Sequence, residues 1–183
     1  MDLSKLLAQS GLIEQLANQF NLGSDQVEKV VENGLPRISS AINENAASEN
    51  GLNSFLKALT DHKDDDVKGM LQNVNKVDTE DGSKILGHIF GERKPAYEEE
   101  LSQEQGISVS NVSGILSSLA PILMGLMGSQ LKKGGKSADL GLQNIIGSFL
   151  GDNSSVTKAA SSFLDEDQGG NFFKDLLGKI FNR

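Results

Sequence analysis

The sequence predicts an all-α, multihelical protein built by tandem duplication of a helical unit of about 85–90 residues. Apolar residues recur three and four positions apart, and Gly, Asn, Ser and Asp mark the turns. No long stretch alternates apolar with polar residues, as a half-buried strand would. The same order of apolar residues then returns about 85 positions later along the chain.

The first unit begins with a short phrase, SKLLAQ at Ser4–Gln9, which returns as SKILGH at Ser83–His88. A third version, LLGKIF at Leu176–Phe181, lies near the end of the chain. The predicted divisions are therefore a first helical unit, a second helical unit and the start of a third that packs on the others: residues 4–82, 83–173 and 174–183.

The longest match places Leu16–Ile38 over Leu101–Leu123 without a gap and pairs Pro36 with Pro121. Because proline is unfavourable inside helices, its matched position favours copying over coincidence. Amphipathic helices need a neighbour to cover their apolar faces, so we expect the two units to bury a shared interface. The alternative is that the terminal motif pairs with the same motif of another molecule.

Polar residues are expected to begin the long helix of each unit. Ser24 or Asp25 can accept hydrogen bonds from free backbone N–H groups, with Glu28 as a reciprocal cap. Ser108 and Ser110 are weaker equivalents in the second unit.

Each long helix then meets its proline. An interior proline costs a helix about 3 kcal/mol, so the helix either kinks or stops and restarts there. The Asn-Gly pair before Pro36 predicts a break in the first unit, and the Ser-Leu-Ala sequence before Pro121 predicts a kink in the second.

Two stretches of the second unit carry a resemblance to a known family: Gly82–Gly91 (GSKILGHIFG) and Leu119–Gly125 (LAPILMG). With them, the second unit resembles the bacterial domain-of-unknown-function family DUF937. The resemblance covers about 50 central residues, and it reaches the flanking units through the internal repeat. It implies an α-helical bacterial protein and supplies no activity, cofactor or catalytic residue.

Composition excludes several kinds of chemistry. Without cysteine, the chain has no disulfide framework, thiol nucleophile or cysteine metal site. A net charge of −8 repels phosphate backbones and anionic membranes, so we expect no nucleic-acid partner. The amino terminus lacks the basic start and uninterrupted apolar run of a signal peptide, which predicts a cytoplasmic protein.

No charged residue occurs between Glu104 and Lys132, and Gly114–Leu131 approaches the length of a membrane-spanning helix. Serine, glutamine and proline dilute this segment, so we expect a buried core helix and no stable membrane span. The alternative is a membrane-seeking helix or one buried in an oligomer.

The leucines and methionines of the same segment form a possible interaction surface, because methionine packs against irregular partners. Its members are Leu123, Met124, Leu126, Met127 and Leu131. Ordinary core packing is the alternative interpretation. If the helix over residues 111–131 is partly exposed, this surface is expected to bind another helix or a second copy of the chain.

Two histidines are candidates for catalysis or metal binding. His88 aligns with Gln9 and Lys179, and three different groups at one repeat position favour a helix surface or a C-terminal turn. His62 lies in a polar segment, and the same structural interpretation is preferred for it.

Three acidic runs resemble the start of calcium loops: Asp61–Asp66, Asp78–Gly82 and Asp165–Gly170. None continues into a complete EF-hand. We therefore interpret these runs as charges that stabilise the starts of helices. Weak binding of a divalent cation is the alternative interpretation.

The sequence contains no nucleophile elbow, phosphate-binding loop or dinucleotide fingerprint in a suitable context. We predict no catalytic, cofactor-binding or metal site, and no cofactor. The leading hypothesis is a non-enzymatic bacterial interaction or assembly module whose apolar helix surfaces bind a protein partner or a second copy. The alternatives are a helix-turn-helix-like nucleic-acid-binding regulator, and a small hydrolase that joins His88 or His62 to carboxylates.

Overall fold

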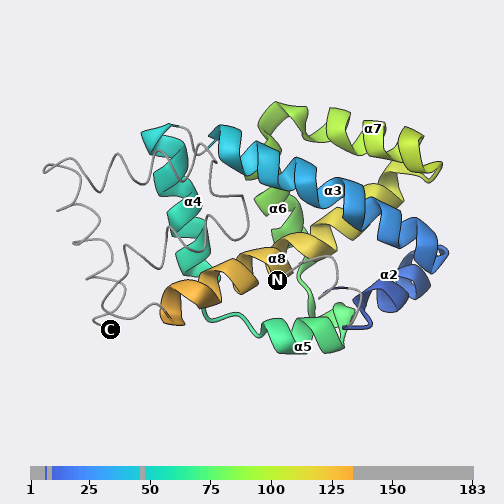
Figure 1. Cartoon of the computed structure of the whole chain (residues 1–183), viewed down its shortest axis with the longest axis horizontal. Helices are drawn as coiled ribbons and strands as arrows, with labels where there is room; N and C mark the ends of the chain where they lie inside the picture. The colour runs from blue at the N-terminus through green and yellow to red at the C-terminus, as the bar shows by residue number, and fades with distance from the viewer. Residues whose placement is uncertain (1–6, 8–9, 46–47, 134–183) are drawn as a thin grey trace, which may run out of the picture. The chain divides into compact units, whose positions relative to one another are not determined.

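The computed structural model describes residue 7 and residues 10–45 and 48–133. Every regular element in these residues is a helix, so the prediction of an all-α, multihelical protein is confirmed (Figure 1). The elements in chain order are α2 (Leu12–Phe20), α3 (Ser24–Asn45), α4 (Glu49–Asp61), α5 (Val67–Gln72), η1 (Val74–Lys76), α6 (Thr79–Phe90), η2 (Gly91–Arg93), α7 (Lys94–Gln105) and α8 (Val109–Lys133).

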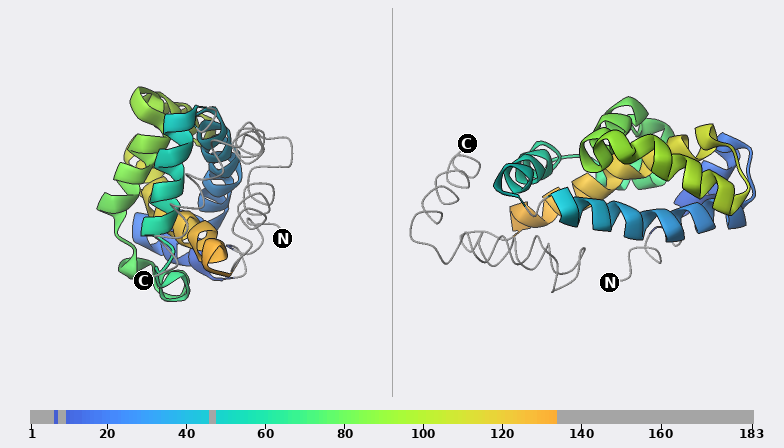
Figure 2. Two further views of the ribbon diagram at one scale, coloured as in Figure 1. Left: turned by 90° about the vertical axis from the view of Figure 1, so that its left-hand side faces the viewer. Right: turned by 90° about the horizontal axis from the view of Figure 1, so that it is seen from above.

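The chain divides into two compact units, each formed from two stretches of sequence. Unit 1 consists of residues 1–41 and 66–125, and unit 2 of residues 42–65 and 126–183. In unit 1, α7 runs alongside the first part of α3, as two directions of view show (Figures 1 and 2).

In unit 1, α2 and α3 form a hairpin. Four residues of α2 are buried at helical spacing: Leu12, Ile13, Leu16 and Ala17. The helix ends where Asn21 adopts the left-handed conformation, with φ 53°. The N–H of Leu22 donates to the carbonyl of Ala17, which closes a Schellman-type C-terminus.

The start of α3 differs from the predicted cap. The helix begins at Ser24, directly after Gly23, and the N–H of Gly23 donates to Oε1 of Gln26 at 3.0 Å. Gln26 therefore supplies the reciprocal bond that was expected from Glu28. Neither Ser24 nor Asp25 is the residue that precedes the helix.

The second hairpin of unit 1, α7–α8, has the same turn. Gly106 is left-handed, with φ 65°, and the N–H of Ile107 donates to the carbonyl of Ser102. Ser108 then caps α8 by accepting from the N–H of Asn111 at 3.1 Å. The prediction of a serine cap is confirmed at Ser108, whereas Ser110 lies inside the helix.

The predicted break before Pro36 is wrong, because α3 continues through the proline as one helix. Only the bond from residue 36 to the carbonyl of Glu32 is lost, and both residues are exposed, so water can hydrate that carbonyl. Val31, Leu35 and Ile38 are buried on either side of the proline, and their packing maintains the helix. Likewise, α8 continues through Pro121.

Side chains of Asp and Gln organise the connection from α5 to α6 in unit 1. Asp66 caps α5 by accepting from the N–H of Gly69 at 2.9 Å, and Asp78 caps α6 by accepting from the N–H groups of residues 80 and 81. Gln15 of α2 donates to the carbonyl of Leu71 at 3.0 Å and accepts from the N–H of Val74 at 2.9 Å. One amide therefore attaches η1 to α2.

Unit 2 contains α4, whose start is capped by Ser48, which accepts from the N–H of Gly51 at 3.2 Å. Leu56 and Leu59 of α4 are buried. Gly128 of α8 lies directly against the backbone of α4: a Cβ there would overlap the carbonyl oxygen of Leu59. The absence of a side chain at Gly128 therefore permits a close crossing of these helices.

Candidate interaction surface

The five residues predicted as an interaction surface are placed as follows. In unit 1, Leu123 is 5% and Met124 2% exposed, and in unit 2, Met127 is 4% exposed. Leu126 is half-buried, and the side chain of Leu131 lies outside the described residues. Three of the five side chains therefore belong to the hydrophobic core of a single chain. Their role in partner binding stays a prediction.

The helix that carries this surface, α8, is also the candidate membrane span. Among the described residues, Val109–Ser129 alone is long and apolar enough to cross a bilayer. However, 78% of its most apolar window is buried inside the protein, which is typical of a core helix.

Gly82 of α6 contacts the backbone of α8 within unit 1. A Cβ at position 82 would overlap the carbonyl oxygen of Ser117 and lie 3.0 Å from Cδ of Pro121. Because proline has no N–H, the carbonyl four residues before it has no helical donor. The carbonyl that Pro121 leaves without a donor is therefore the one that Gly82 covers, and the two stretches with the family resemblance meet at this contact.

Two further glycines of unit 1 accept side chains from a neighbouring helix. A Cβ on Gly34 of α3 would lie 2.8 Å from Cδ2 of Leu116 and 3.9 Å from Cδ1 of Leu101. Gly114 of α8 lies in contact with the ring of Phe20. Together these contacts pack the α2–α3 hairpin on the α7–α8 hairpin.

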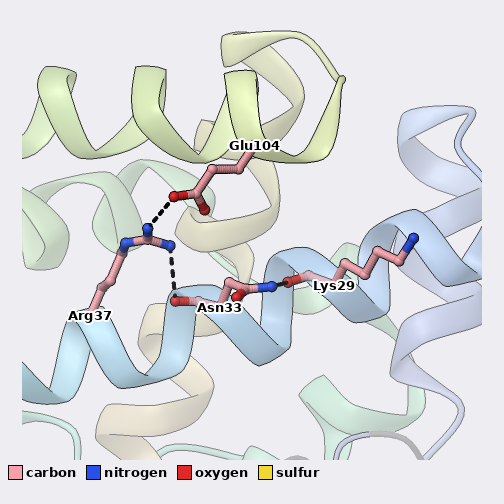
Figure 3. Close-up of polar contacts among 4 residues, drawn as sticks. All are labelled: Lys29, Asn33, Arg37 and Glu104. Carbon is pink, nitrogen blue, oxygen red and sulfur yellow. Dashed lines mark hydrogen bonds and ion pairs between the residues drawn. The ribbon is translucent and has the colours of Figure 1, made fainter.

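An ion pair joins the same two hairpins at their surface. Nη2 of Arg37 donates to Oε1 of Glu104 at 2.7 Å, and the second guanidinium nitrogen, Nη1, donates to the carbonyl of Asn33 (Figure 3). The two charged side chains are 23% and 40% exposed. Water and salt therefore screen the pair, and its contribution to stability is modest.

A second polar cluster connects α6 with α7. Nζ of Lys94 donates to Oγ of Ser83 at 2.8 Å and lies 3.5 Å from Oε1 of Glu98. Glu98 is the charged residue that the described part of the chain buries, at 8% exposure. Lys94 therefore lies within ion-pair distance of the buried carboxylate, whose Oε1 has no hydrogen-bond partner, and its bond to Ser83 ties the two helices together.

The histidines occupy the structural positions that were preferred for them. His88 is exposed in the last turn of α6, where a cation complements the helix dipole. His62 is the C-cap residue of α4, and its Nδ1 lies 2.8 Å from Oδ2 of Asp65.

The acidic runs mostly serve helix starts. Asp66 and Asp78 are helix caps, as the preferred interpretation requires, and the run at Asp165–Gly170 lies outside the described residues. Across residues 10–45 and 48–133, no three His, Cys, Asp or Glu side chains are grouped to hold a metal ion. On the surface of α6, the hydrogen bond with Glu80 and the charge of its carboxylate raise the pKa of Lys84.

Sequence reasoning missed the glycine contacts and the pairs Arg37–Glu104 and Lys94–Glu98. A signal for the first existed, because a glycine inside an apolar helical pattern often marks a close approach. No signal existed for Arg37 and Glu104, because they lie 67 positions apart and only packing brings them together.

Comparison with known proteins gives one match. Residues 4–130 match a family described as a bacterial protein of unknown function, DUF937. The match confirms the resemblance and extends it across the whole of the first predicted repeat, residues 4–82. No curated protein and no solved structure matches the chain.

Proposed function

Since the chain belongs to the DUF937 family, whose description assigns no activity, we propose a function from the chain's own residues. The protein is a tandem duplication of a helical unit, and it acts as a non-enzymatic interaction or assembly module in the bacterial cytoplasm. Its partner is another protein or a second copy, and it requires no cofactor.

The observation that carries the duplication is a turn repeated at one constant offset. Asn21 and Gly106, 85 positions apart, are both left-handed at the end of a helix. The N–H groups of Leu22 and Ile107, also 85 apart, both donate to a carbonyl five residues earlier. Three residues separate the two helices of the hairpin in each case.

The buried positions follow the same offset, as copied helices would. Both members of each of the following pairs are buried: Leu16 and Leu101, Val27 and Val112, Val30 and Ile115, Val31 and Leu116, Ile38 and Leu123, and Ile42 and Met127. The two hairpins therefore bury the same face of their helices, with the same pattern of apolar residues. This correspondence supports a common ancestor for the two hairpins.

One boundary between the compact units falls at corresponding positions of the two repeats. The first stretch of unit 1 ends at Ala41 and its second at Gly125, within one residue of the 85-residue offset. The limits at residues 4–82 and 83–173 remain predictions, and the third motif at 174–183 lies outside the described residues.

An interaction role is supported by how the charged groups are used. The carboxylates of Asp66 and Asp78 cap helices, and those of Glu98 and Glu104 pair with cations of neighbouring residues. These four carboxylates hold helices in place, as expected of groups with a structural role.

The experiment is light scattering on the purified chain over a wide range of concentrations. Assembly predicts a molar mass that rises with concentration, and a strict monomer at high concentration contradicts self-assembly.

Binding to random duplex DNA at low salt tests the alternative, a helix-turn-helix-like regulator, because nonspecific binding to DNA is strongest at low salt. The absence of detectable binding would contradict this alternative.

A further inference from the structure

We infer that self-assembly proceeds by exchange of hairpins between two copies of the chain, an inference that rests on the proposed function. In the exchanged dimer, the α2–α3 hairpin of one copy packs on the α7–α8 hairpin of the other. The contacts are those that join the two hairpins within one chain.

The distribution of apolar surface argues for exchange over docking of an exposed face. In the part of the chain that the structure describes, the large apolar side chain with substantial exposure is Val109, at 41%. A single exposed valine is ordinary for a protein surface. Within the described residues, apolar helix faces can therefore mediate assembly if the contacts that bury them form between chains.

The shape of the interface selects a second copy as the partner. Gly34 leaves room for the side chain of Leu116, with Leu101 beside it, and Gly114 does the same for the ring of Phe20. The Arg37–Glu104 ion pair lies at the edge of the same interface. A partner must present these side chains at the same spacing, and another copy of this chain presents all of them.

The connection between η1 and α6 is suited to act as the hinge. Before it, Gln15 attaches Leu71 and Val74 to α2. After it, Gly82 attaches α6 to α8. Residues 75–78 lie between these attachments, and the backbone of residues 77 and 78 is extended. A change of dihedral angles there would separate the two hairpins without disrupting either, as hinge loops do in domain swapping. Because α4 lies before the hinge and contacts Gly128 of α8, α4 would exchange together with the α2–α3 hairpin.

Mass action sets the balance between the two forms. Their contacts are equivalent outside the hinge, so the closed monomer is favoured by the high effective concentration of hairpins within one chain. Raising the protein concentration favours the dimer. Because exchange requires the hairpins to separate, we expect dimers to form most readily when unfolded protein is refolded at high concentration.

The test uses the full-length chain, which has no cysteine of its own. Two single variants, Arg37→Cys and Glu104→Cys, are mixed in equal amounts, unfolded, refolded together at high concentration, and treated with a short bismaleimide. Exchange predicts a covalent dimer that contains one chain of each variant. The matched control replaces Arg37→Cys with Lys29→Cys, about 12 Å earlier along α3, and is expected to give several-fold less dimer.

The outcomes separate this inference from the proposed function. If light scattering detects association but the mixed sample gives no more covalent dimer than the control, the chains assemble through another surface and exchange is wrong. If light scattering finds only monomer at every concentration, both before and after the protein is unfolded and refolded at high concentration, self-assembly and exchange both fail. The double variant Arg37→Cys/Glu104→Cys reports whether the cysteines react within one closed chain.

Charge reversal gives a second measurement that needs no cross-linker. Arg37→Glu alone and Glu104→Arg alone each place like charges together. An exchanged dimer of the two variants contains one reversed ion pair and one native ion pair. Exchange therefore predicts that native mass spectrometry of the mixture finds more mixed dimers than the statistical half. A statistical distribution contradicts exchange through this interface.

Discussion

Gly82 covers the carbonyl of Ser117 that Pro121 leaves without a helical donor. A glycine in one family-related stretch and a proline in the other therefore form a single packing unit of α6 on α8. Helix propensity alone favours neither glycine in the first turn of α6 nor proline in the middle of α8.

Replacing Gly82 with alanine is expected to lower the free energy of unfolding by about 1–3 kcal/mol, because the methyl group would overlap backbone that cannot rotate away. The matched control is Gly87→Ala on the same helix, where nothing lies within 4 Å of an added Cβ. That variant is expected to gain about 0.5–1 kcal/mol from helix propensity. Urea unfolding followed by circular dichroism measures both, and equal effects would contradict the contact.

The left-handed residues of the two hairpin turns are expected to respond alike to substitution. Gly106→Ala should lower the free energy of unfolding by about 1 kcal/mol, because a Cβ is strained at positive φ. Gly106→Asn should cost less, and Asn21→Gly should be neutral or stabilising by less than about 1 kcal/mol, since asparagine and glycine both tolerate this conformation. Thermal and urea unfolding provide the measurement. A harmless Gly106→Ala would show that the turn is not left-handed.

Removing the cap of α8 by Ser108→Ala is expected to cost about 1 kcal/mol, because the N–H of Asn111 loses its acceptor. Ser110→Ala, two residues later and inside the helix, is the matched control, and its effect should stay within about 0.5 kcal/mol. The difference between the two unfolding free energies reports the cap. If Ser110→Ala lowered the free energy of unfolding as much as Ser108→Ala, the assignment of the cap to Ser108 would be contradicted.

The Arg37–Glu104 pair is expected to show a coupling energy of no more than about 1 kcal/mol in a double-mutant cycle, because both side chains are partly exposed. Substitution by glutamine at each position, singly and together, supplies the cycle. Raising the salt concentration should shrink the coupling. The Glu80–Lys84 pair on α6 is the control, since it lies within one helix and should contribute about 0.3–0.5 kcal/mol.

Part of the candidate surface could be read from the sequence, and part could not. The spacing of Leu123, Met124 and Met127 marks them as members of an apolar helix, and the structure buries all three. The pattern alone did not decide between core and partner contact, because both require the same side chains. The neighbouring helices make that decision by covering the face within one chain.

Several local signals were read correctly where a short stretch contains all the interacting groups, although the cap predicted for α3 at Ser24 or Asp25 was not. Ser108 caps the helix that follows it, and Asp66 and Asp78 begin helices as their charge and hydrogen-bonding capacity favour. The prediction at Pro36 was wrong because local propensity opposes a continuous helix, whereas buried residues on both sides of the proline maintain it.

By itself, the sequence determined the helical class and the cap of α8 at Ser108, because these depend on periodicity and on neighbours within a few residues. Only the tertiary structure decided that α3 runs through Pro36, that Gly82 meets Ser117, and that Arg37 meets Glu104. Each of these depends on which distant helix lies alongside, and the packing of apolar faces, which is not directional, fixes that choice only when the whole chain has folded.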